Sequence, residues 1–188
     1  MRPKFSILIA ALASVAAMAA LPDDVSTSLR GTFDNRAQLD KAGADHAMPH
    51  VTVTIERTPK EDFSLWHVHV ETDSESSFDQ TWAMQSRIEH DGSNALVPYY
   101  QLKQTSPPSA AAFDPQQWLS LEACALRGHF TQTRLAGASE GEQCVAVTMG
   151  VGARRALLPV GIAYEGNRLN VDLNLRGERV RVAADRVK

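Results

Sequence analysis

Apolar and polar residues alternate with a period of two along several short stretches of this 188-residue chain. In Val51–Ile55 and Trp66–Val70, valine, isoleucine and tryptophan take every second position, and threonine or histidine lies between them. Successive side chains of a strand point to opposite faces, so this pattern predicts strands with one buried and one solvated face. The same alternation returns at 144–149, 169–175 and 179–183.

Short polar segments rich in turn-forming residues separate these stretches. They are Thr58–Lys60, Asp91–Asn94, Glu140–Glu142, Glu165–Asn167 and Arg176–Glu178. Because strands joined by short turns pair antiparallel, we expect one all-β domain of nine or ten strands over residues 21–188. The last strands are typical of an up-and-down meander, which loses its sheet edges when it closes, so an antiparallel β-barrel is favoured over a two-sheet sandwich.

Two short segments have helical character. They are Val25–Arg30 and Asp114–Leu119. In the second, Asp114 is placed to cap a helix whose first residue is Pro115. The barrel is therefore expected to carry one or two short helices.

The first twenty residues follow a different pattern. Arg2 and Lys4 precede the apolar run 5–15, and Ala17–Ala19 supplies the small residues that a signal peptidase recognises. We therefore predict a cleaved secretory signal at residues 1–20 and a periplasmic or secreted protein. The apolar run is shorter than the roughly 20 residues that span a bilayer, so no membrane-spanning segment is expected.

Charge and cysteine content narrow the class of partner and the compartment. The chain has 19 Lys and Arg against 22 Asp and Glu, and loss of a signal containing Arg2 and Lys4 makes it more acidic. An acidic chain is a poor match for nucleic acid. Cys124 and Cys144 are the two cysteines, and in an oxidising compartment such a pair is expected to form a disulfide. The alternative, a reactive thiol pair, is disfavoured because the spacing is far from Cys-x-x-Cys.

Few residues suggest a chemistry. His67, His69 and Glu71 share one face of a predicted strand, at a spacing that binds zinc in some β-barrels. The apolar face of that strand belongs to its tryptophan and valines, so we expect the histidines to face water and predict no metal site. Phosphate-binding loops and hydrolytic triads are not recognisable, and no cofactor is predicted.

Several motifs resemble those of a known family. Gly31–Gln38 is similar to the Gly-x-Phe-x-Asn-x-x-Gln opening of the CpcT/CpeT chromophore lyases, and the likeness continues with the strand around Trp66. It resumes at Leu135–Gly137, Gly141–Cys144 and Gly150–Arg155, and Cys124 stands where the other cysteine of the family is expected. The resemblance covers nearly the whole chain after the predicted signal.

This resemblance implies a calycin-like barrel that cradles an open-chain tetrapyrrole. Members of the family attach phycobilin to a cysteine of a phycobiliprotein without a cofactor. The late Trp-Asp-Arg-Gly-Phe motif of the family is missing here, and 169–176 occupies its place. Phycobiliproteins are also cytosolic, whereas this chain is predicted to be exported. A barrel that binds a small hydrophobic or tetrapyrrole ligand is therefore expected rather than a lyase.

The candidate ligand-binding residues follow from the same resemblance and from the chemistry of a bilin. They are Arg36, Trp66, Glu71, Gln85, Arg87 and Tyr99. Arginine would pair with propionates and aromatic rings would line the conjugated plane. The alternatives are that Arg36 is structural and that the aromatic residues belong to the core.

Two other functions remain open at this point. One is a genuine phycobilin lyase that attaches a chromophore to a cysteine. The other is a structural envelope interaction protein with a filled barrel, which the absence of a cavity above roughly 300 Å³ would favour. A homodimer also remains open.

Overall fold

The structure is a computed structural model that describes residues 29–43, 48–71, 77–101, 108–131, 133–139, 142–144, 159–175 and 178–187. The predicted signal at 1–20 lies outside these ranges, as do residues 25–28 of the helix expected at 25–30 and residues 145–149 of an expected strand.

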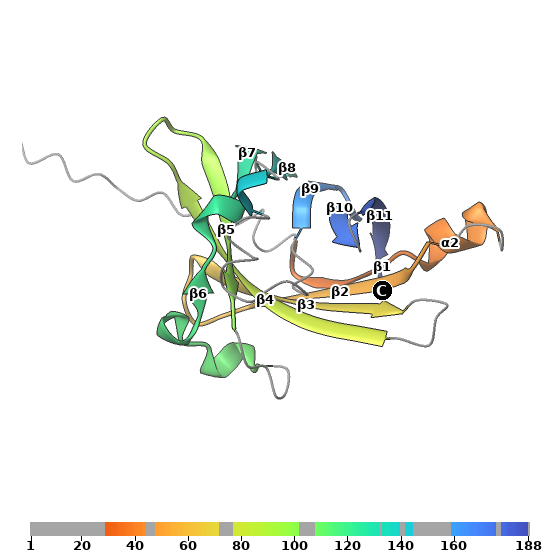
Figure 1. Ribbon diagram of the computed structural model, residues 1–188, viewed down its shortest axis with the longest axis horizontal. Helices are drawn as coiled ribbons and strands as arrows, with labels where there is room; N and C mark the ends of the chain where they lie inside the picture. The colour runs from red at the N-terminus through yellow and green to blue at the C-terminus, as the bar shows by residue number, and fades with distance from the viewer. Residues whose placement is uncertain are drawn as a thin grey trace, which may run out of the picture.

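The described strands form one antiparallel sheet that closes on itself. They are β1 (Gly31–Asp34), β2 (His50–Arg57), β3 (Phe63–Glu71), β4 (Ser77–Ile88), β5 (Asn94–Tyr100), β6 (Leu119–Ser120), β7 (Leu126–Phe130), β8 (Arg134–Ala138), β9 (Pro159–Glu165), β10 (Arg168–Leu175) and β11 (Glu178–Arg186). Ten of these strands make the barrel. The two-residue β6 pairs with the end of β5, on the same edge that pairs with β7. Each barrel strand pairs with its successor along the chain, so the predicted up-and-down barrel is confirmed (Figure 1).

The barrel closes where the first strand meets the last. Phe33 lies opposite Arg186 in the pairing of β1 with β11, and the amide of Val187 donates to the carbonyl of Thr32 at 2.8 Å. The Arg186 guanidinium lies 4.8 Å from the centre of the Phe33 ring. Gly31 has a φ of 132°, and a Cβ there would come within 2.6 Å of that guanidinium, so glycine is required at this position.

The interior of the barrel is packed with the apolar residues of the alternating pattern. Trp66 and Trp82 are cross-strand neighbours on β3 and β4, and both are almost completely buried. They belong to a core cluster that also contains Phe33, Val53, Val68, Leu96, Leu126, Leu135, Tyr164, Leu169 and Val171. Burial of each large side chain contributes roughly 1.5–3 kcal/mol, so this interior is the main source of stability.

A second apolar layer covers the outside of β3 and β4. Phe63 and Leu65 point outward and pack under Phe113 and Trp118, with 5.0 Å between the ring centres of Phe63 and Phe113. The covering segment contains the 3₁₀ turns η1 (Ala110–Ala112), η2 (Pro115–Gln117) and η3 (Glu122–Cys124). The Asp114 carboxylate accepts the Gln116 amide, so the predicted cap is confirmed, although it begins a single 3₁₀ turn.

The helix α2 (Arg36–Ala42) follows β1 directly, and the alternating pattern does not predict it. Asn35 ends β1: its side chain is fully buried, donates to the Pro49 carbonyl at 3.0 Å and accepts the Val51 amide at 2.8 Å. Gln38, on the helix, accepts the Ala183 amide of β11 at 2.8 Å. These bonds attach the start of the helix to both neighbouring strands.

The predicted disulfide joins Cys124 to Cys144, with an S–S distance of 2.06 Å. Cys124 ends η3, and Cys144 belongs to a helical turn at residues 142–144, where a strand was expected to begin. Both cysteines are buried in the core cluster. The bond therefore ties the covering segment to the barrel interior.

Removal of this disulfide is expected to lower the free energy of unfolding by about 3 kcal/mol, because it closes a loop between cysteines 20 residues apart. Urea denaturation of the Cys124→Ser, Cys144→Ser double variant measures the loss. A reducing agent should destabilise the parent and leave the double variant unchanged. Equal stability of parent and variant would contradict a structural role for the bond.

Candidate functional site

At one end of the barrel, the space beside Trp66 is small. A cavity lined by Ile55, Trp66 and Leu96 holds only about 30 Å³, which is room for about one water molecule. The indole N–H of Trp66 donates to the Ser64 hydroxyl at 2.9 Å. Trp66 is therefore part of the packed core at this end of the barrel.

The other predicted ligand residues lie outside the barrel. Arg36 is exposed at the start of α2, and Glu71 is exposed at the end of β3. Arg87, on the outer face of β4, forms ion pairs with Glu89 and Glu122. The structure does not bring these three residues together.

Gln85 and Tyr99 do meet, on the outer face of β4 and β5. The Tyr99 hydroxyl donates to Gln85 Oε1 at 2.9 Å, and Gln85 Nε2 donates to Asp62 Oδ2 at 2.8 Å. The Tyr99 ring also packs edge-on against Phe63, beside the outer apolar layer. This pair therefore fastens the turn before β3 to the sheet, and no cavity among those described includes it.

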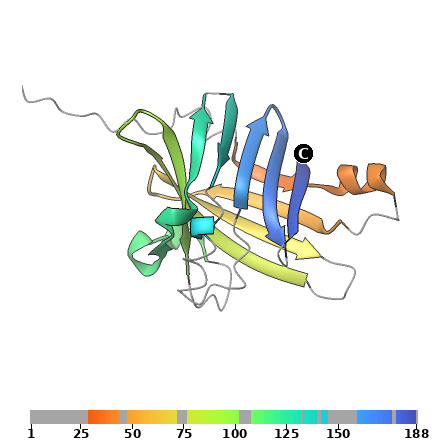
Figure 2. The same cartoon turned by 45° about the horizontal axis from the view of Figure 1, so that its top comes forward.

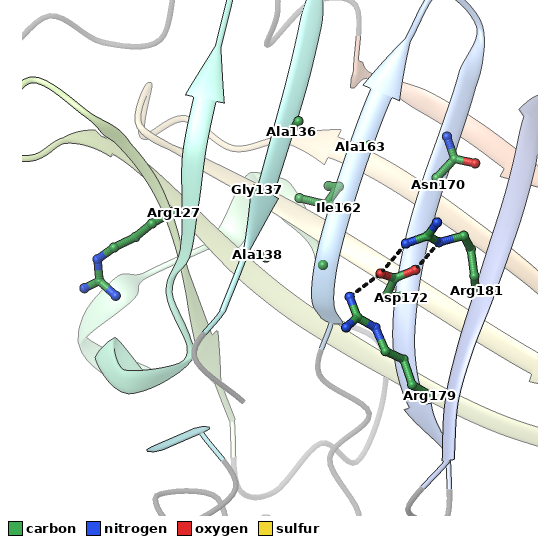
Figure 3. A pocket seen from close by; sticks show the side chains of 11 residues that line it. Arg127, Ala136, Gly137, Ala138, Ile162, Ala163, Asn170, Asp172, Arg179 and Arg181 are labelled. Carbon is green, nitrogen blue, oxygen red and sulfur yellow. Dashed lines mark hydrogen bonds and ion pairs between the residues drawn. The ribbon is translucent and has the colours of Figure 1, made fainter. Parts of the chain in front are cut away.

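The largest described hollow is a groove on the outer face of β7–β11, with a volume of about 590 Å³. In Figure 2 these strands are the teal-to-blue wall of the barrel. The groove is lined by Arg127, Ala136, Gly137, Ala138, Gly161, Ile162, Ala163, Asn170, Asp172, Arg179 and Arg181 (Figure 3).

Small residues form the floor of the groove. Two cross-strand rows run over β8 and β9, in which Ala138 pairs with Gly161 and Ala136 pairs with Ala163. No side chain in these rows extends beyond a methyl group, so the sheet surface is open there. A Cβ on Gly161 would lie 3.0 Å from Asp172 Oδ2, so the glycine also makes room for the acidic wall of the groove.

Three charged side chains form that wall. Arg181 makes a two-point contact with Asp172, with Nε 2.7 Å from Oδ1 and Nη2 3.1 Å from Oδ2. Arg179 donates a further hydrogen bond to Oδ2 of the same carboxylate. Two guanidinium groups therefore share one carboxylate, which leaves one positive charge in excess, and Figure 3 shows both bonded to Asp172 at the edge of the groove.

The local electrostatics keep Asp172 ionised. The hydrogen bond from Arg181 is the largest influence and, together with that from Arg179, holds the pKa of the carboxyl below its ordinary value of 3.8, against the opposing effect of burial. The carboxylate in turn raises the pKa of Arg181. The register of β9 and β10 shifts between Asp172 and Leu173, and such irregularities redirect side chains at the edges of sites.

The opposite wall is balanced in charge. Arg127 lies on β7, separated from the Asp172 cluster by β8 and β9. Its Nη2 is 3.3 Å from the Glu122 carboxylate and its Nε is 3.8 Å from Glu89, and Arg87 pairs with the same two carboxylates. The excess positive charge of the groove therefore sits at Arg179 and Arg181, whose side chains are more than half exposed. Exposed guanidinium groups beside a flat, small-residue floor can bind a carboxylate or phosphate group through two parallel hydrogen bonds.

A smaller hollow, of about 380 Å³, lies on the outer face of β2–β4. Thr52, Thr54, His67, His69 and Thr81 contribute to its lining. Both histidines face outward, as their strand pattern predicts. Within the described ranges, no three His, Cys, Asp or Glu side chains are placed so that they could hold a metal ion.

Comparison with family models, with curated proteins and with solved structures finds no match to this chain. In the part of the chain that the structure describes, no helix combines the length and the apolar character needed to cross a bilayer. The groove must therefore be interpreted from its own residues.

Sequence reasoning missed the groove. Asp172, Arg179 and Arg181 occupy outward positions of the predicted strands 169–175 and 179–183, where polar residues are unremarkable. The available signal was the hairpin itself, because an antiparallel pairing centred on Arg176–Glu178 places Asp172 opposite Arg181. The small residues of β8 and β9 give no signal of their own.

Asp172→Asn is expected to lower the free energy of unfolding by about 1–3 kcal/mol near neutral pH, because the carboxylate charge that strengthens the three hydrogen bonds from Arg179 and Arg181 is lost. The folded pKa of Asp172 is depressed, so its contribution is present above the unfolded value of 3.8 and fades as the pH falls below it. Urea denaturation at several pH values measures this difference.

The matched control is Asp185→Asn, which removes the exposed Arg168 pair on the same wall of the barrel and should cost less. If the two variants lose equal stability near neutral pH, the Asp172 cluster is no more than an ordinary surface ion pair.

Proposed function

We propose that this protein is an exported β-barrel of the CpcT/CpeT type that binds a small, flat, anionic ligand in the outer groove over β8–β10. The observation that carries the proposal is the excess guanidinium charge of Arg179 and Arg181 beside a floor of alanine and glycine. The groove volume of about 590 Å³ falls within the range of roughly 300–1,000 Å³ that is usual for small-molecule sites.

The two arginines differ in what they can offer a ligand. Arg181 is engaged with both oxygens of Asp172, whereas Arg179 gives that carboxylate a single hydrogen bond. Arg179 can therefore turn its remaining N–H groups to an acidic group of the ligand while Arg181 keeps Asp172 in place. The methyl groups of Ala136 and Ala163 would contact the flat face of the ligand.

An open-chain tetrapyrrole fits this description, because it combines a conjugated plane with two propionates. Binding such a molecule requires only the groove. Lyase activity would further require a surface that presents the thiol of a client protein beside the ligand, so we put forward binding rather than bilin attachment.

A filled barrel that acts as a structural envelope protein is the second candidate. The observation that favours it is the burial of Trp66 and Trp82 in the core cluster, together with a cavity beside Trp66 of only about 30 Å³. This candidate predicts that the protein binds none of the small ligands offered to it, so the same experiment separates the two functions.

Titration of the purified protein with biliverdin, haem and a fatty acid, followed by absorbance and calorimetry, is the primary test. We expect saturable binding of the flat tetrapyrrole anions. Loss of Arg179 and Arg181 in the Arg179→Gln, Arg181→Gln double variant should weaken binding about tenfold or more, since one charge-assisted hydrogen bond accounts for that factor.

Two further variants make the test specific. Ala163→Leu would extend a side chain into the open groove and should block binding without disturbing the core. Arg134→Gln removes an exposed arginine of β8 that pairs with Glu165 outside the groove, and it should bind like the parent. Binding that survives both the double variant and Ala163→Leu would place the ligand elsewhere, and no binding by the parent would support the structural alternative.

A further inference from the structure

A chain of alternating carboxylates and imidazoles crosses the outer face of β1–β4, away from the groove. Asp34 Oδ2 lies 2.9 Å from His50 Nε2, and His50 Nδ1 lies 2.8 Å from Glu71 Oε2. Glu71 Oε1 lies 3.2 Å from His69 Nε2, and His69 Nδ1 lies 2.6 Å from Asp79 Oδ1. Five side chains from four strands are thus joined by four contacts of hydrogen-bond length.

Sheet register brings these residues together. His50 pairs with Glu71 across β2 and β3, and His69 pairs with Asp79 across β3 and β4. Asp34 lies opposite Thr52 of β2, and Thr52 is the next residue after His50 on the outer face of that strand. The arrangement therefore follows from the closed barrel and needs no unusual backbone.

The number of available protons decides the state in which this chain of contacts is complete. A neutral imidazole has one N–H group and can donate to one carboxylate only. Both nitrogens of His50, and both of His69, lie within 3.2 Å of a carboxylate oxygen. While the three carboxyl groups are ionised and can only accept, all four contacts are hydrogen bonds only when both rings carry two protons.

We propose that Asp34, His50, Glu71, His69 and Asp79 form a proton-operated clasp that fastens β1–β4 when both imidazoles are protonated and opens when they lose a proton. Deprotonation leaves each ring with a single donor, so each histidine must release one of its two carboxylates. The clasp is independent of ligand binding in the groove.

Among the described residues, charged groups of β11, α2 and β3 lie near the clasp. On β11, Asp185 lies opposite Asp34 in the sheet register, and its carboxylate is paired with Arg168 at 2.8 Å. The amide of Arg36, at the start of α2, donates to Asp34 Oδ1, and the Arg36 charge also favours the ionised form of that carboxyl. His67 lies two residues before His69 on the same face of β3, and its Nε2 is 3.5 Å from Glu56 Oε2 of β2. The described lining of the adjacent hollow includes neither lysine nor arginine, so protons are the main source of positive charge there.

The pKa directions agree with this geometry. The hydrogen bond with Glu71 is the largest influence raising the pKa of His50, and that with Asp79 does the same for His69. Their contribution to stability is therefore complete below the ordinary value of 6.5 and is lost as the pH rises through the folded values.

The carboxylates set the lower limit of the pH range in which the clasp is complete. The contact with His50 lowers the pKa of Glu71, and for Asp34 the bonds from His50 and Arg36 outweigh the effect of burial, so its pKa is also lowered. Their contribution is present above the ordinary values of 4.5 and 3.8 and is lost as the pH falls through the folded values. The clasp therefore contributes most to stability at pH values between these carboxyl values and 6.5.

Opening the clasp also changes the adjacent hollow. His69 and Asp79 line that hollow of about 380 Å³, and they are partners in the clasp. When both imidazoles are protonated, their two positive charges offset two of the three clasp carboxylates. At higher pH this offset is lost and all three negative charges remain. This face of the barrel then becomes more acidic and attracts cationic groups.

The test is a pH titration of the folded full chain by NMR, following the imidazole signals of His50 and His69. We expect both to titrate above 6.5 and the Glu71→Gln variant to shift both midpoints downward together. Glu71 is exposed, so this substitution leaves the folded barrel available for measurement. Midpoints at or below pH 6.5 in the parent, or two midpoints that Glu71→Gln leaves unchanged, would overturn the proposal.

Denaturation at several pH values supplies a second readout. The stability lost in the His50→Gln, His69→Gln double variant should be greatest between about pH 4.5 and 6.5 and should shrink at higher pH. His129→Gln, on the exposed face of β7, is the matched control and should follow the parent at every pH. A loss that does not vary with pH would show that the two histidines act only through packing.

Discussion

The pairing of β1 with β11 is the interaction on which the rest of this structure depends. It joins the first strand to the last and turns a meander of neighbouring strands into a closed barrel. Closure fixes an inside and an outside for every strand, so the apolar half of each alternating pattern fills the interior. The polar half must then carry whatever chemistry the protein has, and both the groove and the clasp lie on the outer surface.

The opening signature at Gly31–Gln38 belongs to this closure. Gly31 admits the guanidinium of Arg186, Phe33 packs beneath it, Asn35 binds the backbone of β2, and Gln38 binds the backbone of β11. Each of the four positions in the Gly-x-Phe-x-Asn-x-x-Gln pattern thus serves the junction of the first strand with its neighbours. A resemblance that rests on this motif supports the barrel fold and gives no information about the ligand.

Period-two alternation was enough to predict β2, β3, β10 and β11, because each has one buried face and regular pairing. It could not predict α2, which follows a strand of only four residues and depends on the buried amide of Asn35. The outer layer was also missed, because Phe63 and Leu65 are apolar at positions that the pattern assigns to solvent. They are buried by Phe113 and Trp118, about 50 residues later in the chain.

Sequence reasoning did not assemble the groove or the clasp, although it placed His69 and Glu71 on one strand face, and the reason is related. Each is assembled across strands by register, and the residues that form it are ordinary polar members of their own strands. The predicted ligand residues were instead selected for an interior site, whereas the described interior is packed around Trp66 and the largest described hollow lies outside. The location of the ligand, inside or outside the barrel, is therefore the central question.

Protein-detected NMR with biliverdin answers that question most directly, because the indole N–H signals of Trp66 and Trp82 report on the interior. We predict that ligand addition shifts the backbone amides of 136–138, 161–163 and 170–172 and leaves both indole signals unchanged. Shifts of the Trp66 and Trp82 indoles, with the amides of β8–β10 unaffected, would contradict an outer binding site.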